Sequence, residues 1–366
     1  MHQVPYRPAR WLRNPHLLTL WGRLFRRAAH FDHHIERWDT HDHDFVDIAR
    51  VNARGAGKPT FLLLHGLEGR ITSHYVSGTL NAASARGWQA NLLIFRTCGG
   101  QTNRQARSYH SGDTDDIDFV VRRLLRERPD SPLVLAGVSL GGNALLKWLG
   151  EQGDAVDPRI VAATAVSSPF DLALCSRHID TGFSRVYSWN FLTTLKTKAF
   201  DKIAAHPGIA DAERVHRART IWEFDDAFTG PVHGFRDAAD YYSRSSSLGF
   251  LAHIRVPTLL LSAQDDPFYP AGLLDTVRSA AALNSAITVE FVERGGHVGF
   301  VEGAHPWAVT SYCERRPAEF GQAVLAGREE QDTLCDASDV TVDDPRRLSA
   351  FSGAPLADMT GVDHRI

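Results

Sequence analysis

Gly137-Val138-Ser139-Leu140-Gly141 is the part of the chain that points most directly to chemistry, because it is a GxSxG pentapeptide. It closes the apolar run Leu133–Val138 and precedes a helix-like stretch that reaches Trp148. A turn of this kind is so sharp that only glycine fits beside the serine. It lifts the hydroxyl off a sheet and aims the next backbone N–H and a helix N-terminus at the reacting centre. The pattern predicts Ser139 as a nucleophile.

A serine hydroxyl is a poor nucleophile at neutral pH, so it needs a base, and the base needs an orienting carboxylate. Asp265 and Asp266 follow the strand-like run Pro257–Ser262, and His297 lies in a glycine-flanked loop after Ile287–Val292. An Asp-Pro pair or a loop histidine alone is common in turns and at surfaces. The three residue types in the order serine, acid, histidine, each behind its own predicted strand, predict a catalytic triad.

An acyl-transfer site also needs two backbone N–H groups where negative charge develops. Leu140, directly after the serine, is expected to supply one. The turn His65-Gly66-Leu67-Glu68-Gly69 follows the run Thr60–His65, and Leu67 is expected to supply the other. An ordinary glycine-rich turn without this role is the alternative.

These residues must be positioned by a sheet, and from residue 60 the chain alternates buried strand-like runs with amphipathic helices. This order is typical of an α/β fold with a mostly parallel, doubly wound sheet. Apolar spacing predicts a helix over 114–127. The strand-like runs are Phe45–Val51, which is expected to be an antiparallel leading strand, Thr60–His65, Gln89–Phe95, Leu133–Val138, Ile160–Val166, Pro257–Ser262 and Ile287–Val292.

The alternation breaks between residues 171 and 252, where the sequence is rich in aromatic residues and lacks strand-like runs. We expect a helical cap over the mouth of the sheet, which would line an acyl pocket and shield the reaction from water. Most of its aromatic side chains are expected to form the core of the cap. The predicted segments are an N-terminal arm that leads into the first strand (1–44), two parts of the core (45–170 and 253–325), the cap (171–252) and an acidic, mobile tail (326–366).

The composition describes a globular protein of 366 residues with 43% hydrophobic residues and a net charge of −3. It lacks the basicity of a nucleic-acid-binding protein. The four cysteines lack CxxC spacing, which favours a reducing compartment over a disulfide framework or a zinc site. We therefore expect a cytoplasmic protein, and no cofactor is implied.

The first 31 residues contain six arginines and no acidic residue, with tryptophan, leucine and phenylalanine between them. Two interpretations stay open. The arm folds onto its own domain, or it makes a weak peripheral contact with the inner membrane surface. The charges interrupt the apolar residues too often for a signal sequence or a spanning helix.

Two other patterns could indicate a functional site. One is a metal site in the His-rich segment, but the dinuclear pattern HxHxDH would need Asp and His where the chain has Phe45 and Val46, so a solvated strand edge is favoured. The other is the HxxxxD spacing of His110 and Asp115, for which a structural loop is favoured. The His-rich segment contains His30, Asp32, His33, His34, His41, Asp42, His43 and Asp44.

Taken together, the motifs resemble the YheT-like branch of the α/β-hydrolases, over residues from about Pro8 to Gln322. Where the family commonly has Asp-Gly-Asp the chain has Asp42-His43-Asp44, and where it often has Arg-Gly the chain has Arg96-Thr97. The matching motifs are Asn14-Pro-His-Leu-Leu-Thr19, His65-Gly-Leu-Glu-Gly69, Phe95-Arg96, Tyr109-His-Ser-Gly112, Gly137-Val-Ser-Leu-Gly-Gly-Asn143, Pro169-Phe-Asp-Leu172, Glu223-Phe-Asp-Asp226, His233-Gly-Phe235, Asp265-Asp-Pro-Phe268 and Gly295-Gly-His-Val-Gly-Phe300.

The resemblance implies an α/β-hydrolase fold, a triad of Ser139, Asp266 and His297, and serine carboxylesterase activity without a cofactor. Asp266 stands four residues before Pro270, as the acid does in many hydrolases of this fold, and Asp265 is expected to support its loop through turn hydrogen bonds. The expected substrates are short- to medium-chain esters or monoacylglycerol-like lipids. The alternatives are an acyltransferase or phospholipase with the same triad, and a catalytically silent binding protein.

Overall fold

The computed structural model describes residues 5–26, 32–51 and 57–339, with side chains up to residue 330. Within these residues eight strands form one sheet in the order β1-β2-β4-β3-β5-β6-β7-β8, in which β1 and β2 run antiparallel to their neighbours and the other strands are parallel. The strands are β1 His34–Asp39, β2 Phe45–Val51, β3 Thr60–Leu64, β4 Gln89–Ile94, β5 Leu133–Val138, β6 Ile160–Val166, β7 Thr258–Ala263, β8 Ile287–Val292 and the hairpin β9 Val301–His305 with β10 Ala308–Ser311.

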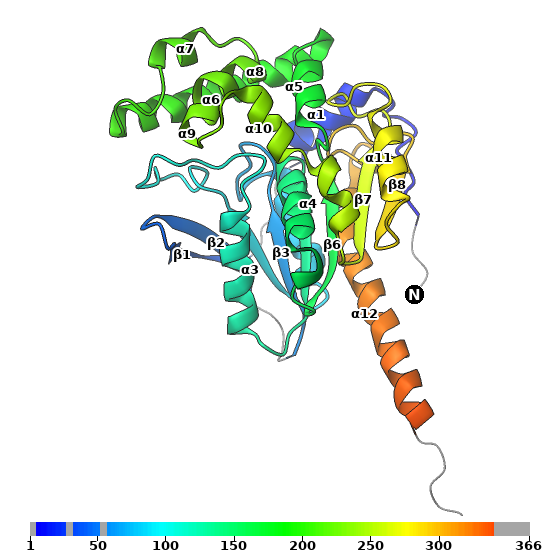
Figure 1. Cartoon of the computed structure of the whole chain (residues 1–366). Helices are drawn as coiled ribbons and strands as arrows, with labels where there is room; N and C mark the ends of the chain where they lie inside the picture. Colours follow the sequence, from blue (N-terminus) through cyan, green and yellow to red (C-terminus); the bar gives the residue numbers. More distant parts are fainter. Residues whose placement is uncertain (1–4, 27–31, 52–56, 340–366) are drawn as a thin grey trace, which may run out of the picture. The chain divides into compact units, whose positions relative to one another are not determined.

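Helices cover both faces of the sheet (Figure 1). One face packs against α3, α4 and α11, and the other against α2 and the first turns of α12. The segment between β6 and β7 is helical and lies over the carboxyl ends of the parallel strands. The helices are α1 Pro15–Phe25, α2 His74–Ser84, α3 Asp115–Glu127, α4 Leu140–Gln152, α5 Leu172–Ile179, α6 Arg185–Ala205, α7 Ala212–Arg217, α8 Ile221–Phe224, α9 Gly230–Val232, α10 Ala238–Ser245, α11 Leu273–Ala281 and α12 Tyr312–Asp339.

The predicted α/β class, the mostly parallel sheet and the helix over 114–127 are confirmed, and each predicted strand occurs within one residue of its expected ends. These strands were recognisable because buried parallel strands are continuous apolar runs. β1 was not assigned, since its sequence His-Ile-Glu-Arg-Trp-Asp has only two apolar residues and lies at a mostly exposed sheet edge. The sequence favoured a solvated strand edge for the His-rich segment, and β1 lies at such an edge.

The expected start of the tail at residue 326 does not coincide with the end of the last helix. Residues 326–339 continue α12, because their Ala, Arg, Glu and Gln side chains favour a helix even where the apolar pattern has ended. Residues 340–366 lie outside the described residues. So do Arg27, which belongs to the arm, and His30, which belongs to the His-rich segment. The fold and site described below belong to the unit that ends at Val324.

A buried arginine fixes the loops at the edge of the sheet. The Arg96 guanidinium is fully buried and bonds to the carboxylates of Asp42 (2.8 Å), Asp44 (3.0 Å) and Asp116 (2.7 Å). A buried charge is tolerated only when it is paired in this way. The two acidic residues that flank His43 are therefore needed as partners for Arg96.

The two departures from the family pattern fall at residues with positive φ. His43 has φ 62° and Thr97 has φ 67°, in the left-handed region that glycine enters freely. The loops thus keep a glycine-like course without glycine. For the β-branched Thr97 this conformation costs about 1–2 kcal/mol, and its N–H is held by the Asn103 side chain at 2.7 Å.

The N-terminal arm folds onto its own domain. Ala9, Leu12 and Leu18 are buried with Val301 of β9, and Ala9 N–H donates to the Val301 carbonyl at 2.9 Å. Asn14 caps α1 by accepting hydrogen bonds from the next two free N–H groups of the first turn. None of the helices within the described residues is long and apolar enough to cross a bilayer.

Candidate active site

Ser139 lies on the tight turn between β5 and α4, with φ 53° and ψ −119°. The turn leaves no room for side chains beside it. A Cβ on Gly137 would lie 2.4 Å from the Gly141 carbonyl oxygen, and one on Gly141 would lie 2.5 Å from the carbonyl oxygen of Leu64 on β3. The glycines of the pentapeptide are therefore required by close packing, and the strain is concentrated at the serine.

The structure brings Ser139, His297 and Asp266 together from three strand ends. The His297 Nε2 atom lies 3.0 Å from Ser139 Oγ, and its Nδ1 atom lies 2.8 Å from Asp266 Oδ2. Asp266 is fully buried and His297 is 10% exposed at the side chain. Because a carboxylate can only accept, the imidazole donates through Nδ1 and leaves Nε2 free to accept the serine proton.

The imidazole is also fixed by packing. The Phe268 ring stacks on it with centroids 3.9 Å apart and an interplanar angle of 19°. Phe268 N–H in turn donates to the second oxygen of Asp266 at 2.9 Å. The rotation of both His297 and Asp266 is thus restricted before any substrate binds.

Asp265 points away from Asp266 and holds the loop that carries His297. Its Oδ1 atom accepts hydrogen bonds from Gly295 N–H (2.7 Å) and Gly296 N–H (2.8 Å), while burial raises the pKa of its carboxyl. The prediction that Asp265 makes turn hydrogen bonds within its own loop is therefore wrong. The adjacent carboxylates bond to consecutive residues of the same histidine loop, Asp265 to its backbone and Asp266 to the His297 ring.

Thr19 of α1 completes the support of this loop. Its hydroxyl accepts a hydrogen bond from His297 N–H at 2.9 Å, and it donates to the Pro15 carbonyl. The sequence reasoning gave Thr19 no role, although it ends the motif Asn14-Pro-His-Leu-Leu-Thr19. A polar residue at the end of a matched motif was the signal that could have found it.

The turn after β3, which carries the N–H of Leu67, lies beside the serine, since a Cβ on Gly66 would be 3.2 Å from Ser139 Cβ. Among the hydrogen bonds of the described residues this N–H has no partner, and Leu140 N–H, at the first position of α4, has none within its helix. The other N–H groups of the turn are occupied, that of Gly66 by the Tyr75 hydroxyl (2.9 Å), that of Glu68 by the Tyr109 hydroxyl (2.8 Å) and that of Gly69 by the Gly66 carbonyl (2.9 Å).

A charged residue of the segment over the sheet is tied to this same turn. Lys198 of α6 donates to the Glu68 carboxylate at 2.7 Å, and the Tyr109 hydroxyl donates to the same oxygen at 2.8 Å. Glu68 has φ 56°, so the contacts stabilise a strained residue directly after Leu67. The sequence reasoning missed Lys198 and Tyr109, because their contacts join residues far apart in the chain.

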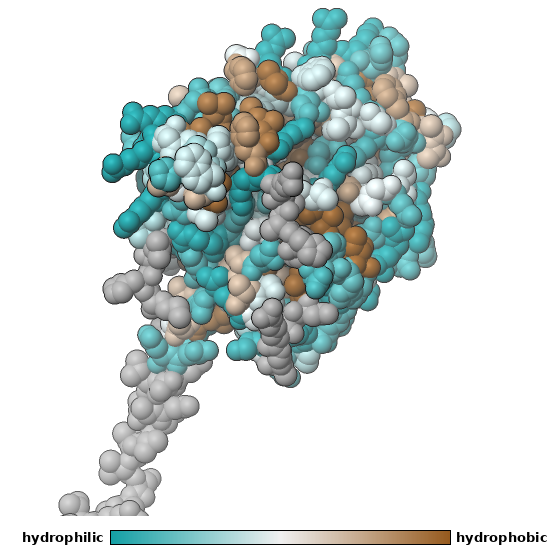
Figure 2. Space-filling model, turned by 180° about the vertical axis from the view of Figure 1, so that it is seen from behind, coloured by the Kyte–Doolittle hydropathy of each residue, from teal (hydrophilic) through white to brown (hydrophobic). Residues whose placement is uncertain are grey.

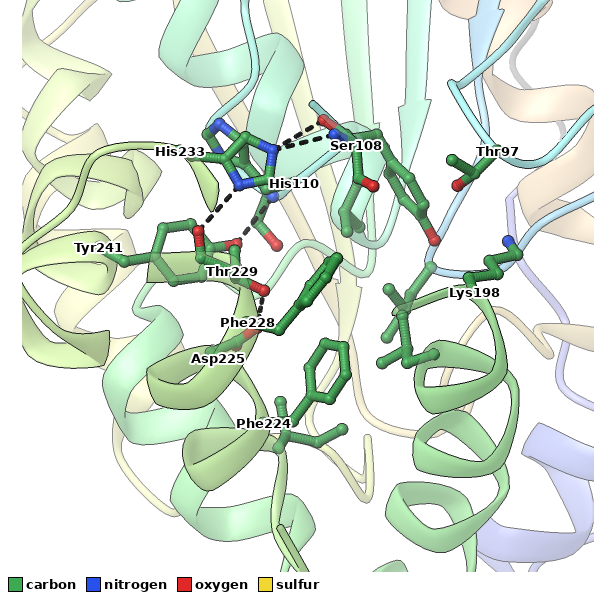
Figure 3. A pocket seen from close by; sticks show the side chains of 16 residues that line it. Thr97, Ser108, His110, Lys198, Phe224, Asp225, Phe228, Thr229, His233 and Tyr241 are labelled. Atoms are coloured by element: carbon green, nitrogen blue, oxygen red, sulfur yellow. Dashed lines mark hydrogen bonds between the residues drawn. The ribbon is translucent and has the colours of Figure 1, made fainter. Parts of the chain in front are cut away.

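A small cavity, which we call the cap pocket, opens beside Leu67 and Leu140 (Figure 3). Its volume is about 80 Å³. Apolar side chains from α6, α8 and the turn that follows form one wall, polar residues gather at one end, and Thr97 and Lys198 lie at the opposite end. The apolar wall consists of Leu195, Ile221, Phe224 and Phe228, and the polar end includes Ser108, His110, Asp225, Thr229, His233 and Tyr241.

The polar groups at the far end of the cap pocket are bonded to one another. The His233 ring bonds to Thr229 O (2.9 Å), and Ser108 N–H donates to the same ring (3.2 Å). The Thr229 hydroxyl donates to Asp225, whose pKa burial raises to about 6. This end is therefore a rigid wall of satisfied polar groups.

The His-rich segment and the pair His110 and Asp115 were the two other candidate sites in the sequence. Within residues 5–26, 32–51 and 57–339 no group of three or more His, Cys, Asp or Glu residues is placed to hold a metal ion. His110 packs against the rings of His233 and Tyr241, and burial keeps its pKa well below the usual value. Asp115 pairs with Arg107 at 3.3 Å.

The sheet order, the serine turn and the strand-end positions of the three residues define a class of protein, and comparison with known proteins identifies it. Residues 59–304 match the family model described as the alpha/beta hydrolase fold. The chain belongs to the α/β-hydrolase fold family.

Within that family the chain is similar to YheT of Escherichia coli K12, a candidate esterase by its name, with 41% identity over 82% of this chain and 88% of YheT. It is 30% identical to the phospholipase ABHD3 of Mus musculus, over 73% of this chain and 64% of that protein. It is also 30% identical to a monoacylglycerol lipase of Saccharomyces cerevisiae, over 73% of this chain and 60% of that protein.

A solved structure shows the same fold. The Pyrococcus furiosus esterase Pf2001 superimposes with a TM-score of 0.52 at 16% identity, over 88% of this chain and 99% of that chain. The predicted resemblance to the YheT-like branch is confirmed by the relatives and by the family match.

Proposed function

We propose that this protein is a serine carboxylester hydrolase that works through an acyl-enzyme on short- to medium-chain esters or monoacylglycerol-like lipids. His297 takes the proton of Ser139 as Oγ attacks the ester carbonyl, and Leu67 and Leu140 N–H stabilise the oxyanion. The imidazolium then gives the proton to the leaving alcohol. Water, activated by the same histidine, releases the acid and restores the serine.

The observation that carries this proposal is the pair of short contacts from His297 to Ser139 Oγ (3.0 Å) and Asp266 (2.8 Å). The names of the relatives favour an ester or lipid substrate, since one is a candidate esterase and another a monoacylglycerol lipase.

Labelling with a fluorophosphonate probe, combined with turnover of p-nitrophenyl esters, tests the proposal. We expect labelling of Ser139 and hydrolysis in the same preparation. Labelling without turnover, but with transfer to an added alcohol or lysophospholipid, would favour the acyltransferase alternative. If the protein shows no labelling and no turnover, a catalytically silent binding protein would be favoured.

We further propose that the surface around α1 makes a weak peripheral contact with anionic lipid. Several exposed apolar side chains lie on α1 and at the start of α6, among them Leu24 (60% exposed) and Trp189 (70% exposed). The two helices are in contact, since Arg23 donates to the Asn190 side chain. Hydrophobic side chains are seen together in the upper part of Figure 2, and residues 5–26 contain five arginines and no acidic residue.

Co-sedimentation with vesicles checks this contact. We expect binding to vesicles that contain anionic lipid, which weakens as salt rises, and a loss of about tenfold in affinity for Trp189→Glu because an apolar side chain is no longer buried in the lipid. Leu283→Glu, at an exposed leucine on another part of the surface, is the matched control. Equal binding of all three proteins, or no binding at low salt, would contradict the contact.

A further inference from the structure

An ester bound in this site has an acyl side and an alcohol side, and the residues that surround the two sides differ. In the tetrahedral intermediate the oxyanion faces Leu67 and Leu140 N–H, and the leaving alcohol oxygen must lie near His297 Nε2 to receive its proton. The acyl substituent then extends away from the imidazole. Leu67 and Leu140 line the cap pocket and His297 does not, so the pocket lies beside these two N–H groups on the side away from the imidazole.

The leaving-group side has a different wall. Phe268 stacks on His297, and the Tyr187 ring lies 5.1 Å from Phe268. His16 Nδ1 lies 3.2 Å from the Tyr187 hydroxyl, and its ring lies 4.6 Å from that of Phe183, which is 54% exposed. A row of packed aromatic rings, which we call the aromatic path, thus extends from the imidazole to the exposed ring of Phe183.

The size of the cap pocket limits what it can hold. An apolar cavity of about 150 Å³ takes one benzene ring, and the cap pocket has about half that volume at about 80 Å³. It therefore has room for about three carbons beyond the carbonyl. The bonded polar groups at its far end, such as His233 with Thr229, prevent a longer apolar chain from extending further (Figure 3).

We propose that the cap pocket binds the acyl half of the ester and restricts it to about four carbons including the carbonyl, whereas the alcohol half leaves along the aromatic path and can be large. This inference rests on the proposed function and narrows it to short-acyl esters of bulky, apolar alcohols. Phe228, which is 5% exposed and lies on the apolar wall, narrows the cap pocket, and together with the polar groups at its end it sets the acyl limit.

Two substrate series on the wild-type enzyme test the proposal. In p-nitrophenyl esters from acetate to dodecanoate, kcat/KM is expected to fall by about tenfold or more beyond butyrate, since methylenes that do not fit are rejected by such factors. In acetate esters of alcohols of increasing size, kcat/KM is expected to change by less than about tenfold. A maximum at octanoate or longer, or a sharp limit on the alcohol with none on the acyl chain, would overturn the proposal.

Variants of the pocket wall provide the second arm. Phe228→Ala, and independently the milder Leu195→Ala, should move the preferred acyl length upward by two or more carbons, while leaving the alcohol series unchanged. Phe200→Ala removes a phenylalanine from the cap's own hydrophobic cluster and is the matched control for loss of stability. Its acyl preference should equal that of the wild type, and an equal shift in all three variants would overturn the role of Phe228.

This outcome can be separated from failure of the proposed function. If Ser139→Ala is inactive and the wild type hydrolyses long acyl chains best, only the assignment of the cap pocket is wrong. If Ser139→Ala retains the wild-type activity, the triad itself is wrong.

Discussion

Ser139→Ala is expected to lower kcat for p-nitrophenyl ester hydrolysis by about 10⁴-fold or more, because it removes the proposed attacking atom and leaves the two N–H groups proposed to bind the oxyanion. The melting temperature should stay close to that of the wild type. The deleted hydroxyl is partly exposed and small, and alanine adds no atom to the crowded turn between Gly137 and Gly141.

The comparison uses steady-state kinetics and thermal unfolding of both proteins side by side. Fluorophosphonate labelling should disappear in the variant. Activity within tenfold of the wild type, with a normal fold, would exclude Ser139 as the nucleophile.

Asp266→Asn is expected to lower kcat by about 10³- to 10⁴-fold. Phe268 N–H donates to one oxygen of Asp266, so the asparagine oxygen will take that position and turn its NH₂ group toward His297 Nδ1. The imidazole must then accept at Nδ1 and carry its proton on Nε2, where it cannot take the proton of Ser139. Asparagine has the same shape as aspartate, so the free energy of unfolding should change little.

Asp265→Asn is the matched control, one residue away. The asparagine oxygen can still accept from Gly295 and Gly296 N–H, which holds the loop, and no contact to the ring is lost. We expect kcat within about tenfold of the wild type. If Asp265→Asn were inactive and Asp266→Asn active in parallel assays, the roles of the two carboxylates would be reversed.

The sheet could be predicted because its strands are buried and continuous in sequence. The runs Leu133–Val138 and Ile160–Val166 occur as predicted and are buried throughout, and Ile287–Val292 also occurs as predicted although it is partly exposed. The edge strand β1 and the continuation of α12 could not, since their polar residues carry little apolar periodicity.

The positions of Ser139, Asp266 and His297 at strand ends followed from the sequence, because residues after parallel strands meet at one edge of the sheet. Their surroundings did not. Thr19 contacts a residue 278 positions away, and Lys198 reaches Glu68 across 130 positions. Such contacts depend on how helices pack over the sheet, which local patterns do not specify. The course of the two loops at His43 and Thr97 likewise became clear only from their backbone angles.

The most direct test of the proposed mechanism is mass spectrometry of the enzyme quenched in acid within its first turnovers of p-nitrophenyl acetate. The account predicts one added acetyl group, located by peptide mapping on Ser139, that appears in the wild type and is absent from Ser139→Ala. Turnover with an unmodified Ser139 peptide, or an acetyl group on a different residue as the reactive intermediate, would contradict it.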